Sequence, residues 1–253
     1  LVVTGFTTAV CGWFLTQTGE DRYRFVPALV LMLVAGVNGA LLTGDLFNLF
    51  VFIEVMLLPS YALIAVTGAW NRLGVGRMFV VVNLLTSTIL LIGVGFVYAV
   101  AGTVNLAELV GAARGNNRLG LAVGIVLLAL AVKGAVVPVH GWLSAAYPVT
   151  SAGVMALFSG LHTKVGLYAI YRISTTVYAG EPPPWRGVLA VVVVVTVLVG
   201  AVGTYGVVRL RRALAYQMIA GVGHILLGLV VLTQAAVAAG IFYLVHHVIT
   251  MAG

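Results

Sequence analysis

The sequence predicts an all-α protein, a polytopic transmembrane helix bundle, and two observations support this. The 253 residues are 62% hydrophobic and 8% charged, with a mean hydropathy of +1.17, whereas a soluble domain carries about 25% charged residues. The hydrophobic residues also form blocks of roughly 20 residues, the length at which a helix crosses a bilayer. Strands of a membrane barrel are about ten residues long and alternate in polarity, so these blocks exclude that architecture.

Nine apolar blocks are expected to form the helices, at residues 1–16, 25–43, 46–68, 78–101, 119–137, 150–177, 187–207, 213–232 and 235–253. The segment GEPPPWR, residues 180–186, precludes a helix because it holds three consecutive prolines. The short connections predict a single transmembrane domain over residues 1–253. No charged leader or cleavage site precedes Leu1, and the last block ends without a polar stop, so we expect an internal fragment of a longer chain.

The composition narrows the possible partners. The single cysteine, Cys11, excludes disulfide frameworks, zinc sites and iron–sulfur clusters. The net charge of +7 comes mostly from arginines at the ends of the apolar blocks, which is typical of a membrane protein and not of a nucleic-acid-binding surface. We therefore predict contact with the lipid bilayer, no nucleic-acid partner, no metal and no cofactor.

The arginines also predict the orientation. If successive helices cross in alternating directions, one side of the membrane receives seven arginines, namely Arg22, Arg24, Arg72, Arg77, Arg209, Arg211 and Arg212. The other side receives four, namely Arg114, Arg118, Arg172 and Arg186. Because basic residues are enriched on the cytoplasmic side, the connections at 17–24, 69–77 and 208–214 are predicted to be cytoplasmic in a multi-pass protein of a bacterial inner or plasma membrane.

Several titratable residues interrupt the apolar blocks. They are Glu54, Lys133, Lys164, His162, His224, His246 and His247. A charged residue at the centre of a spanning helix costs roughly 3 kcal/mol, so these side chains are expected to face one another or water inside the bundle.

Glu54 by itself has a structural alternative, a buried acid that is neutralised by a lysine or protonated. Lys133 and Lys164, at comparable depths on other helices, favour a functional interpretation. Burial disfavours the charged form of both residue types and a nearby opposite charge favours it. A Glu–Lys pair whose separation varies is therefore a proton switch, and a second lysine gives the proton a destination. Pro59, five residues after Glu54, is expected to kink the helix and admit water beside the acid.

The block at 119–137 ends in a predicted break. In KGAVVPVH, Pro138 lacks the amide hydrogen that would bond the carbonyl of Gly134, and its ring clashes with that carbonyl. Broken helices at membrane depth are tolerated where they are buried in protein or line a water-filled cavity. We therefore predict a broken helix near residues 133–140, with Lys133 and His140 beside it; an ordinary proline kink is the alternative.

The remaining histidines are candidate proton carriers, because imidazole titrates near neutral pH. His162 and Lys164 are two residues apart and point to different faces of one helix, so both cannot line one narrow path. We favour Lys164 for the path because lysine is the costlier residue to leave without a partner, and give His162 a packing role or one hydrogen bond. At most one of the adjacent His246 and His247 is expected to face the path. Haem ligation by histidines on facing helices is the competing interpretation, and no other cofactor signal supports it.

Two long motifs carry a family resemblance. TGDLFNLFVFIEVMLLPSYALIAVTG and VKGAVVPVHGWLSAAYPVTSAGVMALFSGLHTKVGLYAIYR closely resemble the antiporter-like membrane subunits shared by respiratory complex I and the Mrp sodium/proton antiporters. The wording GDLFNLFVFIEV is most similar to the D-type Mrp subunits. The resemblance covers essentially all 253 residues. It implies that they form the third to the eleventh helix of a fourteen-helix subunit, with the N-terminal helices and the C-terminal half missing.

The resemblance also implies roles for the buried charges. Glu54 matches the family's glutamate that pairs with the lysine of the broken helix, here Lys133, and Lys164 matches the lysine that continues a polar axis along the membrane plane. His224 and His247 match histidines on the same axis. One departure is Met251, which stands where many D-type chains have a lysine four residues after the histidine pair, so the role of that pair is open.

The function implied is a proton-translocating membrane subunit of a multisubunit monovalent cation (Na⁺)/proton antiporter, and not an enzyme. Its expected partners are the other membrane subunits of a hetero-oligomeric complex, together with protons and Na⁺. The alternative is a proton-pumping membrane-arm subunit of a complex I-like NADH/quinone or ferredoxin oxidoreductase or membrane hydrogenase, whose driving reaction would lie on other chains. A hypothesis from another class is a scaffold whose buried charges only fix helix packing.

Overall fold

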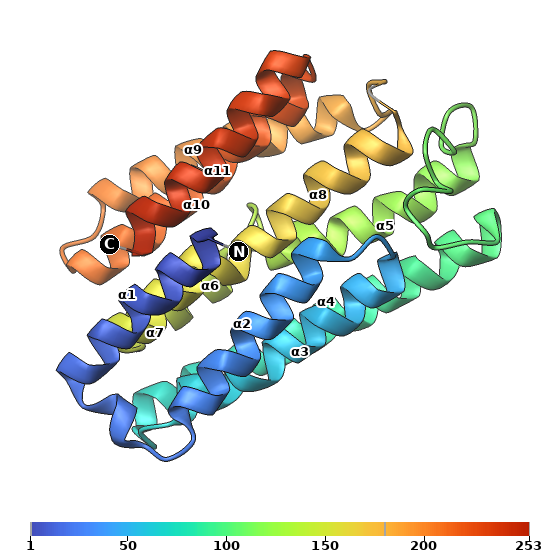
Figure 1. Ribbon diagram of the computed structural model, residues 1–253. Helices are drawn as coiled ribbons and strands as arrows, with labels where there is room; N and C mark the ends of the chain where they lie inside the picture. The colour runs from blue at the N-terminus through green and yellow to red at the C-terminus, as the bar shows by residue number, and fades with distance from the viewer. Residues whose placement is uncertain (1, 180, 253) are drawn as a thin grey trace.

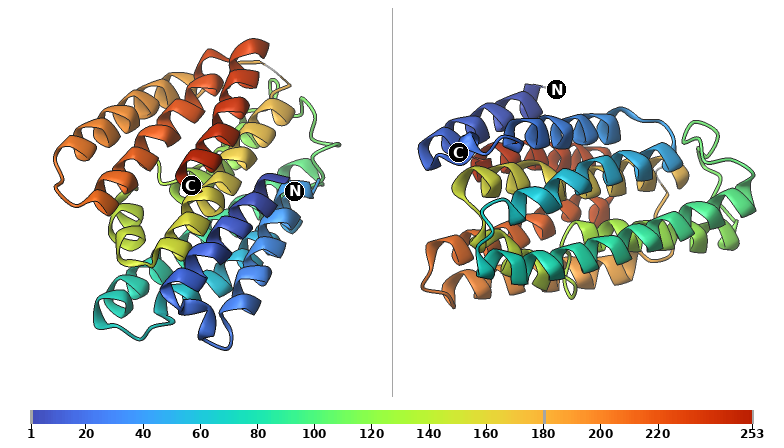
Figure 2. Two further views of the ribbon diagram at one scale, coloured as in Figure 1. Left: turned by 60° about the vertical axis from the view of Figure 1, so that its left-hand side comes forward. Right: turned by 90° about the horizontal axis from the view of Figure 1, so that it is seen from below.

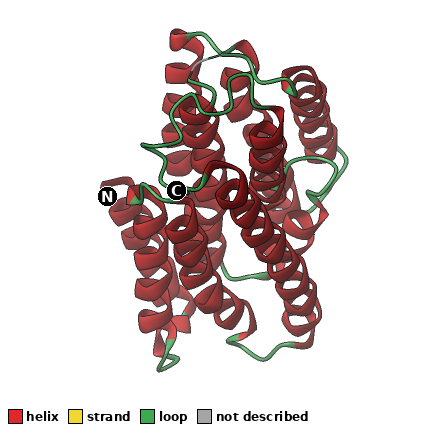
Figure 3. Cartoon of the chain, turned by 90° about the vertical axis from the view of Figure 1, so that its right-hand side faces the viewer, coloured by secondary structure: helices red, strands yellow, loops and turns green. Residues whose placement is uncertain are grey.

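The computed structural model describes residues 2–179 and 181–252, which are mostly helical and contain no strand (Figures 1 and 3). The helices are α1 (Val2–Thr18), α2 (Val26–Leu42), α3 (Leu46–Ala65), α4 (Trp70–Ala101), α5 (Asn117–Lys133), α6 (Gly141–Ala146), α7 (Ala152–Leu157), α8 (Thr163–Val177), α9 (Arg186–Tyr205), α10 (Leu210–Val231) and α11 (Gln234–Ala252). A π-type turn at Phe158–His162 joins α7 to α8 in one continuous rod.

Each of the nine predicted blocks is occupied by helix, so the predicted fold class is confirmed. Five of the described helices, α3, α4, α9, α10 and α11, are long and apolar enough to cross a membrane by themselves. The block at 150–177 crosses as the α7–α8 rod, and the block at 119–137 continues through the break into α6. The largest boundary difference is at α4, which begins at Trp70 and not at 78. The prediction used apolar residues alone, and the residues before 78 include polar ones that continue the helix outside the apolar block.

The α7–α8 rod lies at the centre of the bundle. Figures 1 and 2 show α1–α5 on one side of it and α9–α11 on the other. The rod contacts α1, α2, α5, α10 and α11. Side chains on different faces of this rod therefore reach both halves of the bundle, which is the position a path between the halves requires.

The predicted break is present where expected, because α5 ends at Lys133 and α6 begins at Gly141. A bilayer offers no water to the freed backbone groups, so they need partners within the protein. The indole nitrogen of Trp142 donates to the carbonyl of Val132 at 3.1 Å, and the amide of Val137 donates to the hydroxyl of Thr196 at 3.2 Å. These contacts hold the break in place within the bundle.

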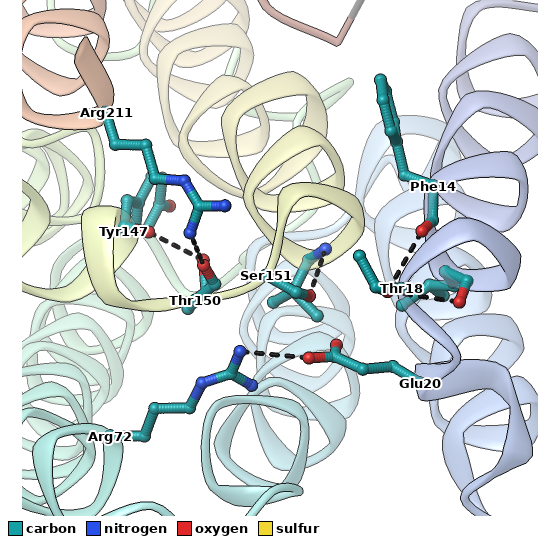
Figure 4. Close-up of polar contacts among 10 residues, drawn as sticks. Phe14, Thr18, Glu20, Arg72, Tyr147, Thr150, Ser151 and Arg211 are labelled. Carbon is teal, nitrogen blue, oxygen red and sulfur yellow. Dashed lines mark hydrogen bonds and ion pairs between the residues drawn. The ribbon is translucent and has the colours of Figure 1, made fainter.

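The connections alternate between two ends of the bundle, as the predicted topology requires. At one end, Glu20 and Arg72 form an ion pair at 3.0 Å, and Arg211 donates to the carbonyl of Thr150 at 2.9 Å (Figure 4). These contacts bring together the connections at 17–24, 69–77 and 208–214 with the turn between α6 and α7. This is the end that the arginine count predicts to be cytoplasmic.

At the other end, three arginines cap the C-termini of three helices. Arg114 donates to the carbonyls of Tyr178 and Ala179, directly after α8, at 3.3 and 2.7 Å. Arg186 donates to the end of α10 at 2.6 Å, and Arg172 donates to the carbonyls that end α2. Cations at a helix C-terminus satisfy its unpaired carbonyls and complement its dipole. Three of the four arginines assigned to this end therefore have a structural reason to be there.

Replacing Arg72 with glutamine is expected to destabilise the bundle. The side chains of Arg72 and Glu20 are only 12% and 9% exposed, and removing one partner of a buried pair leaves an uncompensated charge that costs about 3 kcal/mol. The thermal unfolding midpoint of the purified complete complex measures this. Arg77→Gln, which changes an exposed arginine of the same helix, is the control; an equal loss in both variants contradicts the prediction.

Candidate functional site

Lys133 is the last residue of α5 and only 3% exposed. Its ammonium donates to the side-chain oxygen of Asn83 on α4 at 2.8 Å and lies 3.3 Å from Nε2 of His162 in the π-type turn. An imidazole nitrogen next to an ammonium is the acceptor when the imidazole is neutral. Lys133 thus has two hydrogen-bond partners from two other segments, directly beside the helix break.

Glu54 lies on α3, close enough for its charge to act on Lys133. The ion pairs among the described residues are Arg72–Glu20 and Arg114–Glu181, so Glu54 and Lys133 do not form a closed pair in this conformation. One carboxyl oxygen of Glu54 and the hydroxyl of Tyr61 are buried without a hydrogen-bond partner. An unpartnered buried polar group costs about 1–3 kcal/mol, so this conformation leaves the acid poorly satisfied.

The sequence favoured Lys164 over His162 for the path, and in the structure it is His162 that lies beside Lys133. The two side chains do point to different faces of the rod, as predicted. His162 is completely buried, and its ring lies among those of Phe79, Phe158 and Trp142, with centroid distances of 5.6, 5.4 and 6.4 Å. Its Nδ1 is buried without a hydrogen-bond partner, so the contact of the ring with Lys133 is made through Nε2 alone.

Lys164 forms the start of a second polar group on the other face of the rod. It is 4% exposed, and its ammonium donates to the carbonyl of Ser159 in the π-type turn at 2.6 Å. A cavity of about 270 Å³ adjoins it, and the lining includes Thr4, Tyr168 and Tyr171. Water occupies about 30 Å³ per molecule in the liquid, so the cavity has the volume of several molecules, although its lining is mostly apolar.

His247 belongs to this second group. Its ring is buried, and Lys164 lies within electrostatic range of it. Gly221 of α10 makes the space for the ring, because a Cβ at that position would lie 1.9 Å from Nε2 of His247. Of the adjacent pair, His247 therefore points inward and His246 is exposed, in agreement with the prediction that at most one faces the interior.

His224 is also exposed, and its Nδ1 donates to the carbonyl of Ala220 at 2.8 Å. The ring of Tyr243 lies between the histidines, 5.7 Å from that of His224 and 5.9 Å from those of His246 and His247. The predicted residues therefore fall into two buried clusters and a pair on the outer face of the bundle. Glu54 and Lys133 lie in one cluster, Lys164 and His247 lie in the other, and His224 and His246 lie on the outer face.

Sequence reasoning missed Asn83. It is the single amide in the block at 78–101, and it lies on a buried stripe with Phe79, Thr86, Ser87 and Leu90. The spacing of that stripe, in steps of three and four, is the signal that identifies the inward face of α4. At Met251, where a lysine was expected, the backbone carbonyl accepts a hydrogen bond from the Ser159 hydroxyl at 2.9 Å.

Two further features lie outside these clusters. A groove of about 1080 Å³ runs between α5 and α9, with the break at residues 136–139 in its wall, and its lining is mostly apolar. Within the described ranges, no group of three or more His, Cys, Asp or Glu side chains is arranged to hold a metal ion.

The family described as "NADH:quinone oxidoreductase/Mrp antiporter, TM" matches residues 43–253. The D-type subunit of the Na⁺/H⁺ antiporter of Alkalihalophilus pseudofirmus is 38% identical over 258 aligned residues, which cover 100% of this chain and 52% of the relative. The chain thus spans about half the length of the curated relatives it matches.

Solved structures show the same relationship. A chain of the Mrp complex from Dietzia sp. DQ12-45-1b superposes with a TM-score of 0.95 at 50% identity, over 99% of this chain and 47% of that one. A chain of the membrane-bound sulfane sulfur reductase, an archaeal respiratory membrane complex, superposes with a TM-score of 0.78 at 28% identity, over 88% of this chain and 47% of that one.

Proposed function

Because the chain belongs to the NADH:quinone oxidoreductase/Mrp antiporter transmembrane family, we propose that it is the proton-translocating part of a membrane subunit of a multisubunit Na⁺/H⁺ antiporter. Other membrane subunits would complete the complex and the route of the cation. The sequence identities of the solved structures support this choice. The chain is 50% identical to a chain of the Mrp complex and 28% identical to a chain of the respiratory reductase. The likeness to that respiratory complex favours one alternative, a proton-pumping subunit powered by a redox reaction on other chains.

The observation that carries the proposal is the position of Lys133. Its ammonium is buried beside a helix break and bonded to neutral partners, while the unpaired carboxyl of Glu54 lies within electrostatic reach. A lysine near a carboxylate keeps its proton, and a buried lysine drawn away from that carboxylate releases it more readily. Small changes in the separation of the two side chains therefore load and unload the lysine.

The proton leaves Nζ of Lys133 and binds Nε2 of His162, the nearest titratable group, so that one N–H bond breaks and one forms. Lys164 lies two residues further along the same rod and receives the proton with the help of water in the adjoining cavity. His247 lies beyond Lys164 and carries the proton towards the exposed histidines, His224 and His246. In this scheme, the end bearing Glu20 and Arg72 faces the cytoplasm.

Replacing Glu54 with glutamine is expected to lower sodium-driven proton exchange about tenfold, because the amide removes the charge that reloads Lys133. The measurement is the pH change inside vesicles that contain the complete complex, normalised to assembled complex. Glu108→Gln, in the exposed loop after α4, should exchange as the wild type does. A scaffold role predicts the opposite result, in which Glu54→Gln lowers the yield of complex and leaves the exchange per complex intact.

A further inference from the structure

Asn83 has both ends of its side-chain amide engaged. Its nitrogen donates to the carbonyl of Phe79, one turn earlier in α4, at 2.8 Å, and its oxygen accepts from Lys133 at 2.8 Å. A backbone carbonyl only accepts and an ammonium only donates, so the orientation of the amide is fixed by its partners. The side chain is 2% exposed and therefore holds the lysine within the protein interior.

From this geometry we propose that Asn83 is a positioning residue that holds the ammonium of Lys133 away from Glu54 and towards His162. The inference rests on the proposed function, in which the Lys133 ammonium moves between two positions. One position is beside Glu54, and the inference assigns the other to the contact with Asn83. The titratable groups that face Lys133 are Glu54 from α3 and His162 from the π-type turn. The Asn83 amide on α4 is a third neighbour and is not titratable.

An amide suits this position because it is neutral. A carboxylate in the same place would bind the ammonium as a full opposite charge and hold it there. An aliphatic side chain would leave the ammonium with His162 as its single hydrogen-bond partner when it leaves Glu54, which is costly inside a membrane protein. A dipolar partner of intermediate strength lets the lysine come and go.

The test uses the full-length subunit in its complete complex, with sodium-driven exchange in vesicles measured across a range of pH. Asn83→Leu keeps the size of the side chain and removes the amide. It is expected to lower exchange about tenfold and to move the alkaline limb of the pH profile to lower pH, because the charged lysine loses its acceptor. Thr88→Val, on the exposed face of the same helix, is the matched control and should leave both the rate and the profile unchanged.

A carboxylate at the same position tests the reverse change. Asn83→Asp is expected to lower exchange and to move the alkaline limb to higher pH, because Lys133 then remains charged between two acids. The double variant Asn83→Asp/Glu54→Gln swaps the positions of the acid and the amide on either side of the lysine. Its rate of proton exchange is expected to be several-fold higher than that of Asn83→Asp alone. Because this double variant keeps one acid and one amide beside Lys133, it also tests the inference if Asn83→Leu does not assemble.

Two results overturn the inference. One is an assembled Asn83→Leu complex with the rate and pH profile of the wild type. The other is a double variant that exchanges no faster than Asn83→Asp. Lys133→Met in the same series distinguishes a failure of the proposed function from a failure of the role of Asn83. Normal exchange in that variant contradicts the proposed function itself. Loss of exchange in Lys133→Met together with wild-type behaviour of Asn83→Leu contradicts the role of Asn83 alone.

Discussion

Lys133→Met is expected to reduce sodium-driven proton exchange to the level of vesicles without the complex. Methionine is nearly as long as lysine and fits the same space, but it has no proton to give. The substitution leaves the oxygen of Asn83 and Nε2 of His162 without their donor and leaves Glu54 without a basic partner. The rate per assembled complex, measured from the internal pH after a sodium jump, tests this.

Lys133→Arg separates charge from proton transfer at the same position. Arginine stays protonated under all physiological conditions, so it preserves the electrostatic partner of Glu54 and cannot release a proton to His162. The expected result is a complex that assembles more fully than Lys133→Met and exchanges equally poorly. Normal exchange in Lys133→Arg would show that no proton passes through this residue.

The sequence was sufficient to identify the helices and the break, because both depend on local properties. Block length and apolarity determine where a chain crosses a bilayer, and Pro138 removes a backbone donor wherever it lies. Glu54 and Lys133 could be identified because an acid and a base in apolar blocks are costly unless they share an interior.

The partners of Lys133 were harder to predict because the rotation of a uniformly apolar helix about its axis has no strong sequence signal. Asn83 was missed for this reason. An isolated amide in a membrane helix can pack, hydrogen-bond to its own backbone or contact another helix, and the sequence does not distinguish these three roles. The preference for Lys164 over His162 rested on the higher cost of burying a lysine without a partner, which does not indicate which of the two residues lies nearer Lys133. The π-type turn at 158–162 adds a residue to one turn and rotates the remainder of the rod. His162 contacts Lys133, and Lys164 lies at the cavity that α1, α2 and α11 line.

The two clusters make the central rod the critical element of the proposed path. His162 and Lys164 are separated by one residue of the chain, yet one belongs with Glu54 and the other with His247. A proton that passes between the halves of the bundle therefore passes around the rod, and the cavity beside Lys164 supplies room for water on the far side. Correct packing of α10 against its neighbours matters equally, since α10 carries the glycine that accommodates His247.

Gly200→Val is expected to prevent assembly of the bundle. Gly200 lies on α9 where that helix meets α10 most closely, and a Cβ there would lie 2.3 Å from the backbone nitrogen of Ala220. Close helix packing in membranes depends on such small residues. Overpacking costs typically about 1–3 kcal/mol when side chains can move; here the clash is with backbone, so the two helices must separate. The fraction of subunit that co-purifies with the complex measures the effect.

Gly95→Val is the matched control, because Gly95 is an exposed glycine inside α4 and a Cβ there meets no atom within 4 Å. It introduces the same side chain into a helix of similar environment and should leave the yield of complex unchanged. A shift of α10 away from α9 also moves Gly221 and the space that His247 occupies. Any Gly200→Val complex that does assemble is therefore expected to exchange protons more slowly per molecule than Gly95→Val, and equal rates would contradict the coupling between this helix contact and the second cluster.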